Sequence, residues 1–353
     1  MMQSRMLEIQ ALGAQGDGVT LSGGERQYVP FALPGETVRT FGSGLPEIVS
    51  APSPERRPPS CRHFGVCGGC AAQHMSDTLY AEWKRGNVVA AFSQRGLDPA
   101  ISPLVPVPPG SRRRTVLTGR RDRGHVTLGY HRHGSHELVD IGECPVMRPA
   151  IVSGLPVLRA VCAALPVAEL RLTVLAARSG LDVAIEGAKA RTAGPTAAEL
   201  ARIVSQSGIA RLTVAGETII ERAAVTLPIA GVETAVPPGV FVQAVGEAEA
   251  EMVARVIAAT HGSRRIADLF CGIGTFALSL AKGARIAGAD SDARAVAALN
   301  AAARSRQGIK PIETTVRDLF REPLSSRELD DFDAVVFDPP RAGALKQAEQ
   351  LAR

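Results

Sequence analysis

The segment Asp268-Leu-Phe-Cys-Gly-Ile-Gly-Thr-Phe276 constrains the fold more than any other part of this 353-residue chain. It has the pattern of a strand that ends, turns tightly on Gly272 and Gly274, and enters a helix. A second acid, Asp290, follows about 20 residues later, as in doubly wound folds that hold a nucleoside cofactor. The motif Phe337-Asp-Pro-Pro-Arg341 then follows a later strand-like run, at the sheet edge where such folds place their ligands.

Residues 236–353 alternate between helix-like and strand-like periods. This order is typical of the first half of a parallel sheet that is flanked by helices. The predicted elements are helix 246–260, strand 264–270, helix 275–282, strand 284–289, helix 292–306, strand 312–317 and strand 332–337. The fold class predicted for this region is therefore α/β, with a Rossmann-like sheet.

Two cofactor classes compete for the glycine loop. An NAD site is one interpretation, because Ala277 fits the last position of the Gly-x-Gly-x-x-Gly/Ala fingerprint. The full order of Asp-Leu-Phe-Cys-Gly, Gly-Ala-Asp and Asp-Pro-Pro favours S-adenosylmethionine and hence a methyltransferase. In that case Asp290 accepts both ribose hydroxyls, Asp318 meets the adenine amino group, and Asp338 lies where the sulfonium meets the target base. Thr275 is expected to cap the helix after the loop.

Charge and composition leave nucleic-acid binding open. The net charge of +5 and the pI of about 9.0 are values that an ordinary globular protein also reaches. Arginines crowd residues 112–123 and histidines follow over 125–136, which indicates either a surface that meets phosphates or a solvated strand pair. No apolar run approaches about 18 residues, and the N-terminus lacks the core of a signal peptide. A soluble, cytoplasmic protein without membrane contact is predicted.

Three domains are predicted along the chain. Residues 5–50 alternate apolar and polar side chains between glycine-rich turns, which indicates a small β-barrel. A proline-rich linker follows over residues 51–60, and residues 101–235 have a β-rich pattern. The predicted boundaries are 1–52 for the barrel, 53–235 for a central domain and 236–353 for the α/β domain.

Four of the six cysteines have a metal-ligand pattern. Three are spaced as Cys61-x5-Cys67-x2-Cys70, and Cys144 follows in a polar turn. Disulfides are rare in the cytosol, so metal binding is favoured over them. An iron–sulfur cluster, a zinc ion and a redox Cys-x-x-Cys remain open, although zinc sites more often show two short cysteine pairs. Cys162 lies in an apolar run and is expected to be inert core, whereas Cys271 lies inside the glycine loop.

These regions together resemble the bacterial 5-methyluridine RNA methyltransferase family. Residues 5–50 are similar to its N-terminal TRAM barrel, which has an OB-like architecture, and the central region is similar to its iron–sulfur domain. Phe241-Val-Gln243, 268–274, Gly288-Ala-Asp290 and 337–341 match its cofactor motifs. The resemblance implies an RNA substrate, with rRNA favoured over tRNA, and a monomeric enzyme. It also implies S-adenosylmethionine contacts from Gln243, Phe270, Asp290 and Asp338, and a [4Fe–4S] cluster on Cys61, Cys67, Cys70 and Cys144.

Three departures from the family pattern affect the expected activity. Val245 stands where the family often has Asn, and Asp290 replaces its usual Glu. The family's Ser-Cys-Asn-Pro nucleophile segment and its later general-base Glu are both missing. Uracil C5 needs a cysteine thiolate to add at C6 before it can take a methyl group, and a base must then remove the C5 proton. The hypothesis is that the chain is a fragment whose nucleophile and base lie beyond Arg353, and that it does not methylate uridine by itself.

Two other functions compete with this hypothesis. An RNA N-methyltransferase would also use an acid-Pro-Pro motif and would need no cysteine nucleophile. Arg341 counts against it, because such enzymes normally place an aromatic residue there to stack on a flipped base. A non-catalytic RNA-binding iron–sulfur protein is the second alternative, and it would bind RNA in a strongly salt-dependent way.

Overall fold

A computed structural model describes residues 5–22, 24–41, 45–187 and 195–353. The chain forms two compact units. Unit 1 comprises Met1–Pro108 and Thr127–Pro145, and unit 2 comprises Pro109–Val126 and Val146–Arg353. The division into domains at 1–52, 53–235 and 236–353 stays a prediction. Among the described residues, no helix is both long and apolar enough to cross a membrane.

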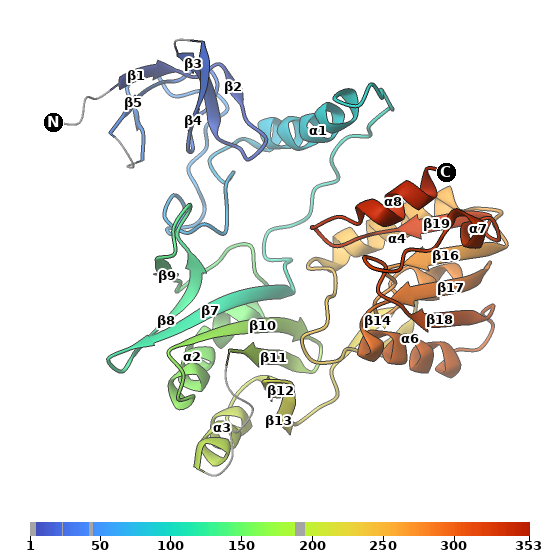
Figure 1. Ribbon diagram of the computed structural model, residues 1–353. Helices are drawn as coiled ribbons and strands as arrows, with labels where there is room; N and C mark the ends of the chain where they lie inside the picture. Colours follow the sequence, from blue (N-terminus) through green and yellow to red (C-terminus); the bar gives the residue numbers. More distant parts are fainter. Residues whose placement is uncertain (1–4, 23, 42–44, 188–194) are drawn as a thin grey trace. The chain divides into compact units, whose positions relative to one another are not determined.

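Unit 1 begins with two small antiparallel sheets (Figure 1). Leu7, Val29 and Val38 point inward from their strands and are buried together, as the alternating pattern predicts. One sheet has the order β1 (Arg5–Glu8), β5 (Thr37–Thr40) and β6 (Glu47–Ile48), and the other has β2 (Ala11–Leu12), β3 (Gly18–Ser22) and β4 (Glu25–Val29). These small sheets are consistent with the predicted barrel-like architecture.

Helix α1 (Asp77–Ser93) follows the small sheets and packs on them. Ser76 begins it, because its side chain accepts a hydrogen bond from the Leu79 N–H. The Trp83 indole donates to the Gly13 carbonyl at 2.8 Å, which attaches the helix to the turn before β3. Unit 1 also contains β9 (Leu138–Asp140), which pairs with β8 (His125–His131) in an antiparallel hairpin.

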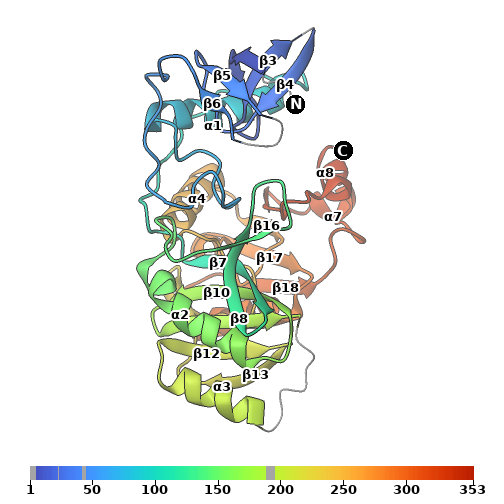
Figure 2. The ribbon, with the colours of Figure 1, turned by 90° about the vertical axis from the view of Figure 1, so that its left-hand side faces the viewer.

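Unit 2 contains a mixed sheet that two helices cover on one face (Figure 2). Its strands have the order β13 (Glu217–Glu221), β12 (Ile209–Val214), β11 (Gly180–Glu186), β10 (Glu169–Ala177) and β7 (Arg114–Asp122). The covering helices are α2 (Pro149–Ala164) and α3 (Pro195–Ser205). The β-rich prediction for 101–235 missed both. In α2 the apolar residues extend around the helix and Pro156 lies inside it, so the sequence lacks a clear amphipathic signal.

The second sheet of unit 2 is parallel and has the order β18-β17-β16-β19. Its strands are β16 (Arg265–Leu269), β17 (Arg285–Asp290), β18 (Ile312–Val316) and β19 (Ala334–Phe337). The helices around it are α4 (Gly246–Ala259), α5 (Ala277–Leu280), α6 (Ala293–Ser305), α7 (Ser326–Leu329) and α8 (Leu345–Leu351). This order confirms the α/β class. Strands β17 and β18 are added on one side of β16, and β19 is added on its other side. Such folds bind ligands at the point between β16 and β19 where the order of strands reverses.

Apolar side chains cover both faces of the parallel sheet. On one face Ile266 and Leu299 pack with the hairpin of β14 (Thr226–Ile229) and β15 (Val232–Ala235). On the other face Leu269 packs with Leu319 and Leu324. Burial on both faces explains why these strands read as nearly continuous apolar runs in the sequence.

Candidate functional site

The glycine loop at the end of β16 has a backbone that few residues adopt. Phe270 has a φ of 65°, Gly272 of 53° and Gly274 of 96°, all in the left-handed region. The N–H groups of Phe270 and Cys271 donate to the Ala289 carbonyl, which holds the loop against the end of β17. A side chain at Gly274 would overlap the Leu299 side chain of α6. The loop therefore requires glycine for both its conformation and its packing.

The helix after the loop is shorter than predicted, and Thr275 does not cap it. Helix α5 spans Ala277–Leu280, its N-cap is Phe276, and no side chain caps it. Thr275 instead accepts a hydrogen bond at its carbonyl from the Ser279 hydroxyl at 3.1 Å. The capping prediction was wrong because the turns of the glycine loop continue past Thr275 before the first regular helical residue.

Asp290 lies at the end of β17 and reaches across the glycine loop. One carboxylate oxygen accepts the Gly272 N–H at 2.9 Å and the other accepts the Asp292 N–H at 2.8 Å. Each oxygen of a carboxylate can accept a second hydrogen bond. The carboxylate is therefore held in one orientation by the backbone and keeps acceptor capacity for a pair of hydroxyl groups.

Gln243 and Asp338 lie side by side although 95 positions separate them in sequence. The Gln243 side-chain amide donates to the Asp338 carboxylate at 3.3 Å. Partial burial raises the pKa of Asp338, and the hydrogen bond from Gln243 opposes that shift. Asp338 follows β19, the neighbour of β16 in the sheet. The two predicted cofactor residues thus meet at the point where the order of strands reverses.

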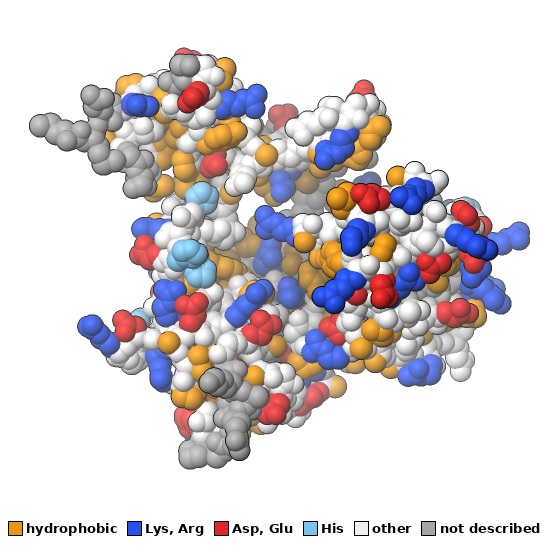
Figure 3. All heavy atoms as spheres, in the orientation of Figure 1, with side chains coloured by type: hydrophobic (Ala, Val, Ile, Leu, Met, Phe, Trp, Pro, Cys, Tyr) orange, Lys and Arg blue, Asp and Glu red, His pale blue; other side chains and the backbone are white. Residues whose placement is uncertain are grey.

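Arg113 positions the segment that carries Gln243, a role that sequence reasoning missed. Its guanidinium donates to the Gln243 carbonyl at 3.0 Å and to the Glu249 carboxylate at 2.8 Å, and the arginine is buried. The neighbouring Arg120 pairs with Glu169. Much of the arginine-rich segment is therefore occupied within the fold. Positive and negative side chains are also interspersed on the face in Figure 3, so no single-sign patch is evident there.

Phe270 contributes an aromatic wall beside the glycine loop. Its ring centroid lies 5.5 Å from that of Phe320 and 6.0 Å from that of Phe337. Asp318 begins the turn that carries Phe320, because its carboxylate accepts the Phe320 N–H at 3.0 Å. An apolar wall next to carboxylates at strand ends suits a ligand with an aromatic base and hydroxyl groups.

Asp268 is the most unusual residue of the site. Its side chain is buried, with 1% of the residue exposed, and neither carboxylate oxygen accepts a well-formed hydrogen bond from the described residues. Burial raises its pKa to about 7; the nearby Ala277 N–H lowers it, and the carboxylates of Asp338 and Asp290 raise it. A buried carboxyl without partners is costly, so its presence points to a ligand or a proton.

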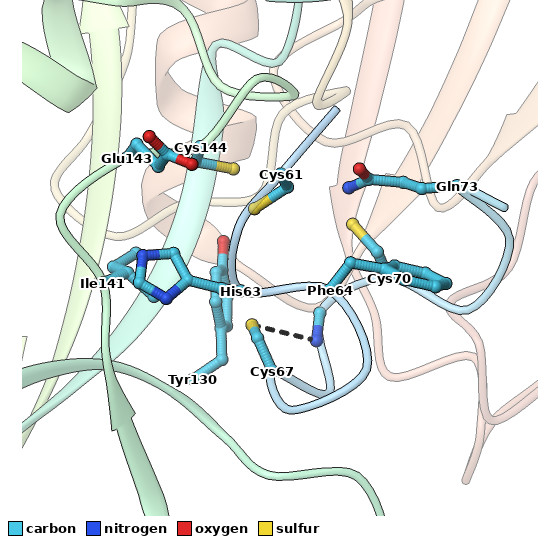
Figure 4. Close-up of a pocket in the computed structure, with 11 residues that line it drawn as sticks. Cys61, His63, Phe64, Cys67, Cys70, Gln73, Tyr130, Ile141, Glu143 and Cys144 are labelled. Atoms are coloured by element: carbon cyan, nitrogen blue, oxygen red, sulfur yellow. Dashed lines mark hydrogen bonds between the residues drawn. The ribbon is translucent and has the colours of Figure 1, made fainter. Parts of the chain in front are cut away.

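The four predicted metal ligands line one pocket in unit 1. Figure 4 shows the sulfur atoms of Cys61, Cys67, Cys70 and Cys144 around a common space. Two contacts bring the distant Cys144 loop to the first cysteine: the Gly142 N–H donates to the His63 ring at 3.3 Å, and Glu143 accepts the Arg62 N–H at 3.0 Å. The loop that carries Cys67 pairs with the end of β8.

The thiols of this pocket act on one another electrostatically. Burial raises the pKa of Cys67, the Gly69 N–H donates to its sulfur at 3.4 Å and opposes this, and the other three cysteines raise it further. A positively charged metal group would relieve this mutual repulsion. In the part of the chain that the structure describes, no group of three or more His, Cys, Asp or Glu is arranged to hold a metal ion.

An aromatic cluster joins the cysteine pocket to the small sheets within unit 1. Phe64 lines the pocket, and its ring centroid lies 5.0 Å from Phe31 and 5.4 Å from His74. Burial, and to a smaller extent Arg56, lowers the pKa of His74 to about 4, so this imidazole is neutral at pH 7.

The remaining two cysteines, Cys162 and Cys271, are both buried away from solvent in unit 2. Burial raises the pKa of Cys162 to about 12, which confirms its prediction as inert core.

The fold and the site define a methyltransferase, and comparison with known proteins agrees. Residues 231–353 match the family model described as the methyltransferase small domain. An RNA methyltransferase of Rhizobium meliloti (strain 1021) is 44% identical over 363 aligned positions, which cover 100% of this chain and 87% of that protein. An RNA methyltransferase of Caulobacter vibrioides is 42% identical and is covered over 86% of its length. The chain belongs to this RNA methyltransferase family.

More distant relatives have named targets. The 23S rRNA (uracil(1939)-C(5))-methyltransferase RlmD of Alkalilimnicola ehrlichii is 29% identical over 96% of this chain and 82% of its own length. Among solved structures, the Pyrococcus abyssi tRNA (uracil-54, C5)-methyltransferase in complex with S-adenosyl-L-homocysteine superimposes with a TM-score of 0.72. It is 21% identical and covers 98% of this chain. This likeness confirms the fold.

Proposed function

We propose that this protein methylates uridine C5 in RNA with S-adenosylmethionine as the methyl donor. The observation that carries the proposal is the convergence of Gln243, Asp290 and Asp338 around a glycine loop, at the reversal point of a parallel sheet. The family supplies methyl transfer to RNA as the reaction class. The uracil-C5 targets named for two relatives favour this position over an exocyclic amine.

Each proposed cofactor residue has a distinct task. Asp290 accepts the ribose hydroxyls, because the loop backbone already fixes its carboxylate. Phe270, which is partly exposed, packs against the adenosine. Gln243 and Asp338 orient the methionine end and the target base from the β19 side. The charges favour S-adenosylmethionine, since a site with three aspartates attracts a cation and repels the pyrophosphate of NAD.

The thiolate for C6 addition is not assigned to any of the six cysteines. Cys271 lies within the glycine loop. Burial raises its pKa far above neutral, and a buried thiol is a poor nucleophile. Cys162 is core, and the other four line the pocket of unit 1. The chain's own residues therefore account for cofactor binding, and the nucleophile and the general base are left without an assignment.

The cysteine pocket is proposed to hold a [4Fe–4S] cluster. Four thiols, a backbone N–H donor to sulfur and two glycines that let the backbone approach closely fit such a group. Methyl transfer moves no net electrons, so the cluster would stabilise unit 1 and present it to RNA.

RNA is the proposed partner, with rRNA favoured over tRNA, and the small sheets of unit 1 are proposed as a TRAM-like RNA surface. A monomer is proposed in solution. The alternative functions are an RNA N-methyltransferase and a non-catalytic RNA-binding iron–sulfur protein. Nucleoside mass spectrometry of RNA incubated with the protein and S-adenosylmethionine separates them: 5-methyluridine supports the proposal, a methylated amine supports the first alternative, and RNA binding without a methylated product supports the second.

Cofactor binding is tested by calorimetric titration of the chain with S-adenosylmethionine. Asp290→Ala is expected to weaken binding about tenfold to a hundredfold, because hydrogen bonds to a charged group are lost. RNA affinity should hardly change. The matched control is Asp331→Ala, which removes an exposed carboxylate of the same unit and should bind normally. Equal affinities for Asp290→Ala and the wild type contradict the assignment of the ribose site.

A further inference from the structure

Three carboxylates lie at the same edge of the parallel sheet. Asp268 lies near the end of β16, Asp290 ends β17, and Asp338 directly follows β19. The carboxyl ends of neighbouring parallel strands lie at one edge, so these charges act on one another. Both Asp338 and Asp290 disfavour the charged form of Asp268.

Asp268 differs from the other two carboxylates in its hydrogen bonding. Asp290 accepts two backbone N–H groups and Asp338 accepts the Gln243 amide. Asp268 has 1% exposure and no well-formed hydrogen bond from the described residues. An ionised carboxylate in such a place loses its hydration without replacement, so the protonated form is favoured until a cation arrives.

The groups that face Asp268 leave no other counter-charge. The carboxylates of Asp338, after β19, and of Asp290, on β17, act on Asp268. The Cys271 thiol of the glycine loop also lies near it. Burial is the main cause that raises the pKa of Cys271, and Asp268 raises it further. The N–H of Ala277 favours its charged form. Among the described residues, no Lys, Arg or His acts on this carboxyl.

We propose that Asp268 is a proton-linked positioning residue: it is protonated in the empty site and releases its proton to solvent when the cationic cofactor binds. This inference rests on the proposed function, because S-adenosylmethionine brings both a sulfonium and an ammonium group. The carboxyl O–H bond breaks, the proton goes to the buffer, and the carboxylate becomes the counter-charge of the bound cation. Asp268 thereby couples cofactor affinity to pH.

The sign of the coupling follows from linkage. Since the pKa of Asp268 in the free protein is about 7, about 0.9 proton is bound at pH 6 and has to be released on binding. Affinity for S-adenosylmethionine should therefore fall about fivefold between pH 7 and pH 6, and close to tenfold for each further pH unit. Above pH 7 the coupling fades, because the carboxyl is already ionised.

Calorimetry in two buffers of different ionisation enthalpy measures the proton count with the wild-type chain alone. Release of close to one proton at pH 6 is expected, and binding without proton release overturns the inference. Asp268→Asn should remove both the release and the pH dependence, while Asp331→Asn should keep them. Release that persists in Asp268→Asn overturns the assignment to this residue.

A titration with S-adenosylhomocysteine identifies the charge that Asp268 senses. This ligand keeps the ammonium group and lacks the sulfonium. Proton release with both ligands supports a contact with the ammonium, and release with S-adenosylmethionine alone supports a contact with the sulfonium. If the wild-type chain binds neither ligand at pH 7.5, the proposed function fails and the inference falls with it. Binding without proton release leaves the proposed function standing and rejects the role of Asp268.

Discussion

At the scale of single residues, the burial of each charge decides whether it stabilises the fold or waits for a ligand. Glu36 is fully buried, and its carboxylate accepts hydrogen bonds from the Arg56 guanidinium and from the backbone N–H groups of Leu33 and Ser53. Asp268 is almost as fully buried, but its carboxylate accepts no comparable set of hydrogen bonds from the described residues. The first is a structural anchor of unit 1, and the second is the candidate sensor of cofactor charge.

Arg56→Ala should destabilise unit 1 by about 3–5 kcal/mol, because it leaves the buried Glu36 carboxylate without its counter-ion. Denaturant unfolding followed by Trp83 fluorescence measures the change. Arg39→Ala is the control: it breaks the exposed pair with Glu47 and should cost less than about 1 kcal/mol. Similar losses for the two variants contradict the anchor role.

The same anchor predicts how unit 1 responds to acid. Burial raises the pKa of Glu36, but its hydrogen bonds to Arg56 and to the backbone outweigh burial and lower the pKa overall. A lowered pKa means that the group stabilises the fold above its unfolded pKa of about 4.3 and loses this contribution as the pH falls through the folded value. The free energy of unfolding should therefore decline below about pH 4, and less so in Arg56→Ala.

At the scale of elements, the helix that follows β17 is held by the residue just before it. Asp292 caps α6, since its carboxylate accepts the N–H groups of Arg294 and Ala295 at 2.9 and 3.3 Å. The backbone N–H of the same residue donates to Asp290. One residue therefore begins the helix and orients the proposed ribose ligand, but it uses different atoms for the two tasks.

Asp292→Ala should cost about 0.5–2 kcal/mol in the free energy of unfolding of unit 2, as expected for a lost N-cap. Affinity for S-adenosylmethionine should change little, because the backbone contact to Asp290 remains. Thermal unfolding with and without cofactor separates the two effects. Asp292→Asn keeps a capping oxygen and should retain most of the stability; a loss equal to that of Asp292→Ala would argue against capping.

At the scale of the whole molecule, the proposed metal group and the proposed cofactor belong to different compact units. Unit 1 contains all four pocket cysteines, and unit 2 contains Gln243, Phe270, Asp290 and Asp338. Within unit 1 the cysteine pocket contacts the small sheets through the rings of Phe64 and Phe31. Loss of the metal group should therefore weaken unit 1 and its contacts with RNA more than cofactor binding.

Cys67→Ser is expected to lower the iron and sulfide content of anaerobically purified protein and to lower the unfolding midpoint of unit 1. Affinity for S-adenosylmethionine should stay within about twofold of the wild type. Cys162→Ala serves as the control, since it removes a cysteine from the core of unit 2 and should leave the iron content unchanged. Iron-free wild-type protein with an unchanged midpoint contradicts the cluster proposal.

The sequence by itself determined the order of helices α4 to α6 and strands β16 to β19, the glycine loop and the acids at the strand ends, because local periodicity and turn chemistry encode them. It did not predict the short helices α7 and α8. Helices α2 and α3 were not predicted from the sequence, since their burial depends on a sheet that forms from distant strands. The tertiary structure alone decided that Gln243 meets Asp338 across 95 positions, that Arg113 supports this segment, and that Asp268 accepts no well-formed hydrogen bond from the described residues. Those facts arise from long-range packing, which a local pattern does not specify.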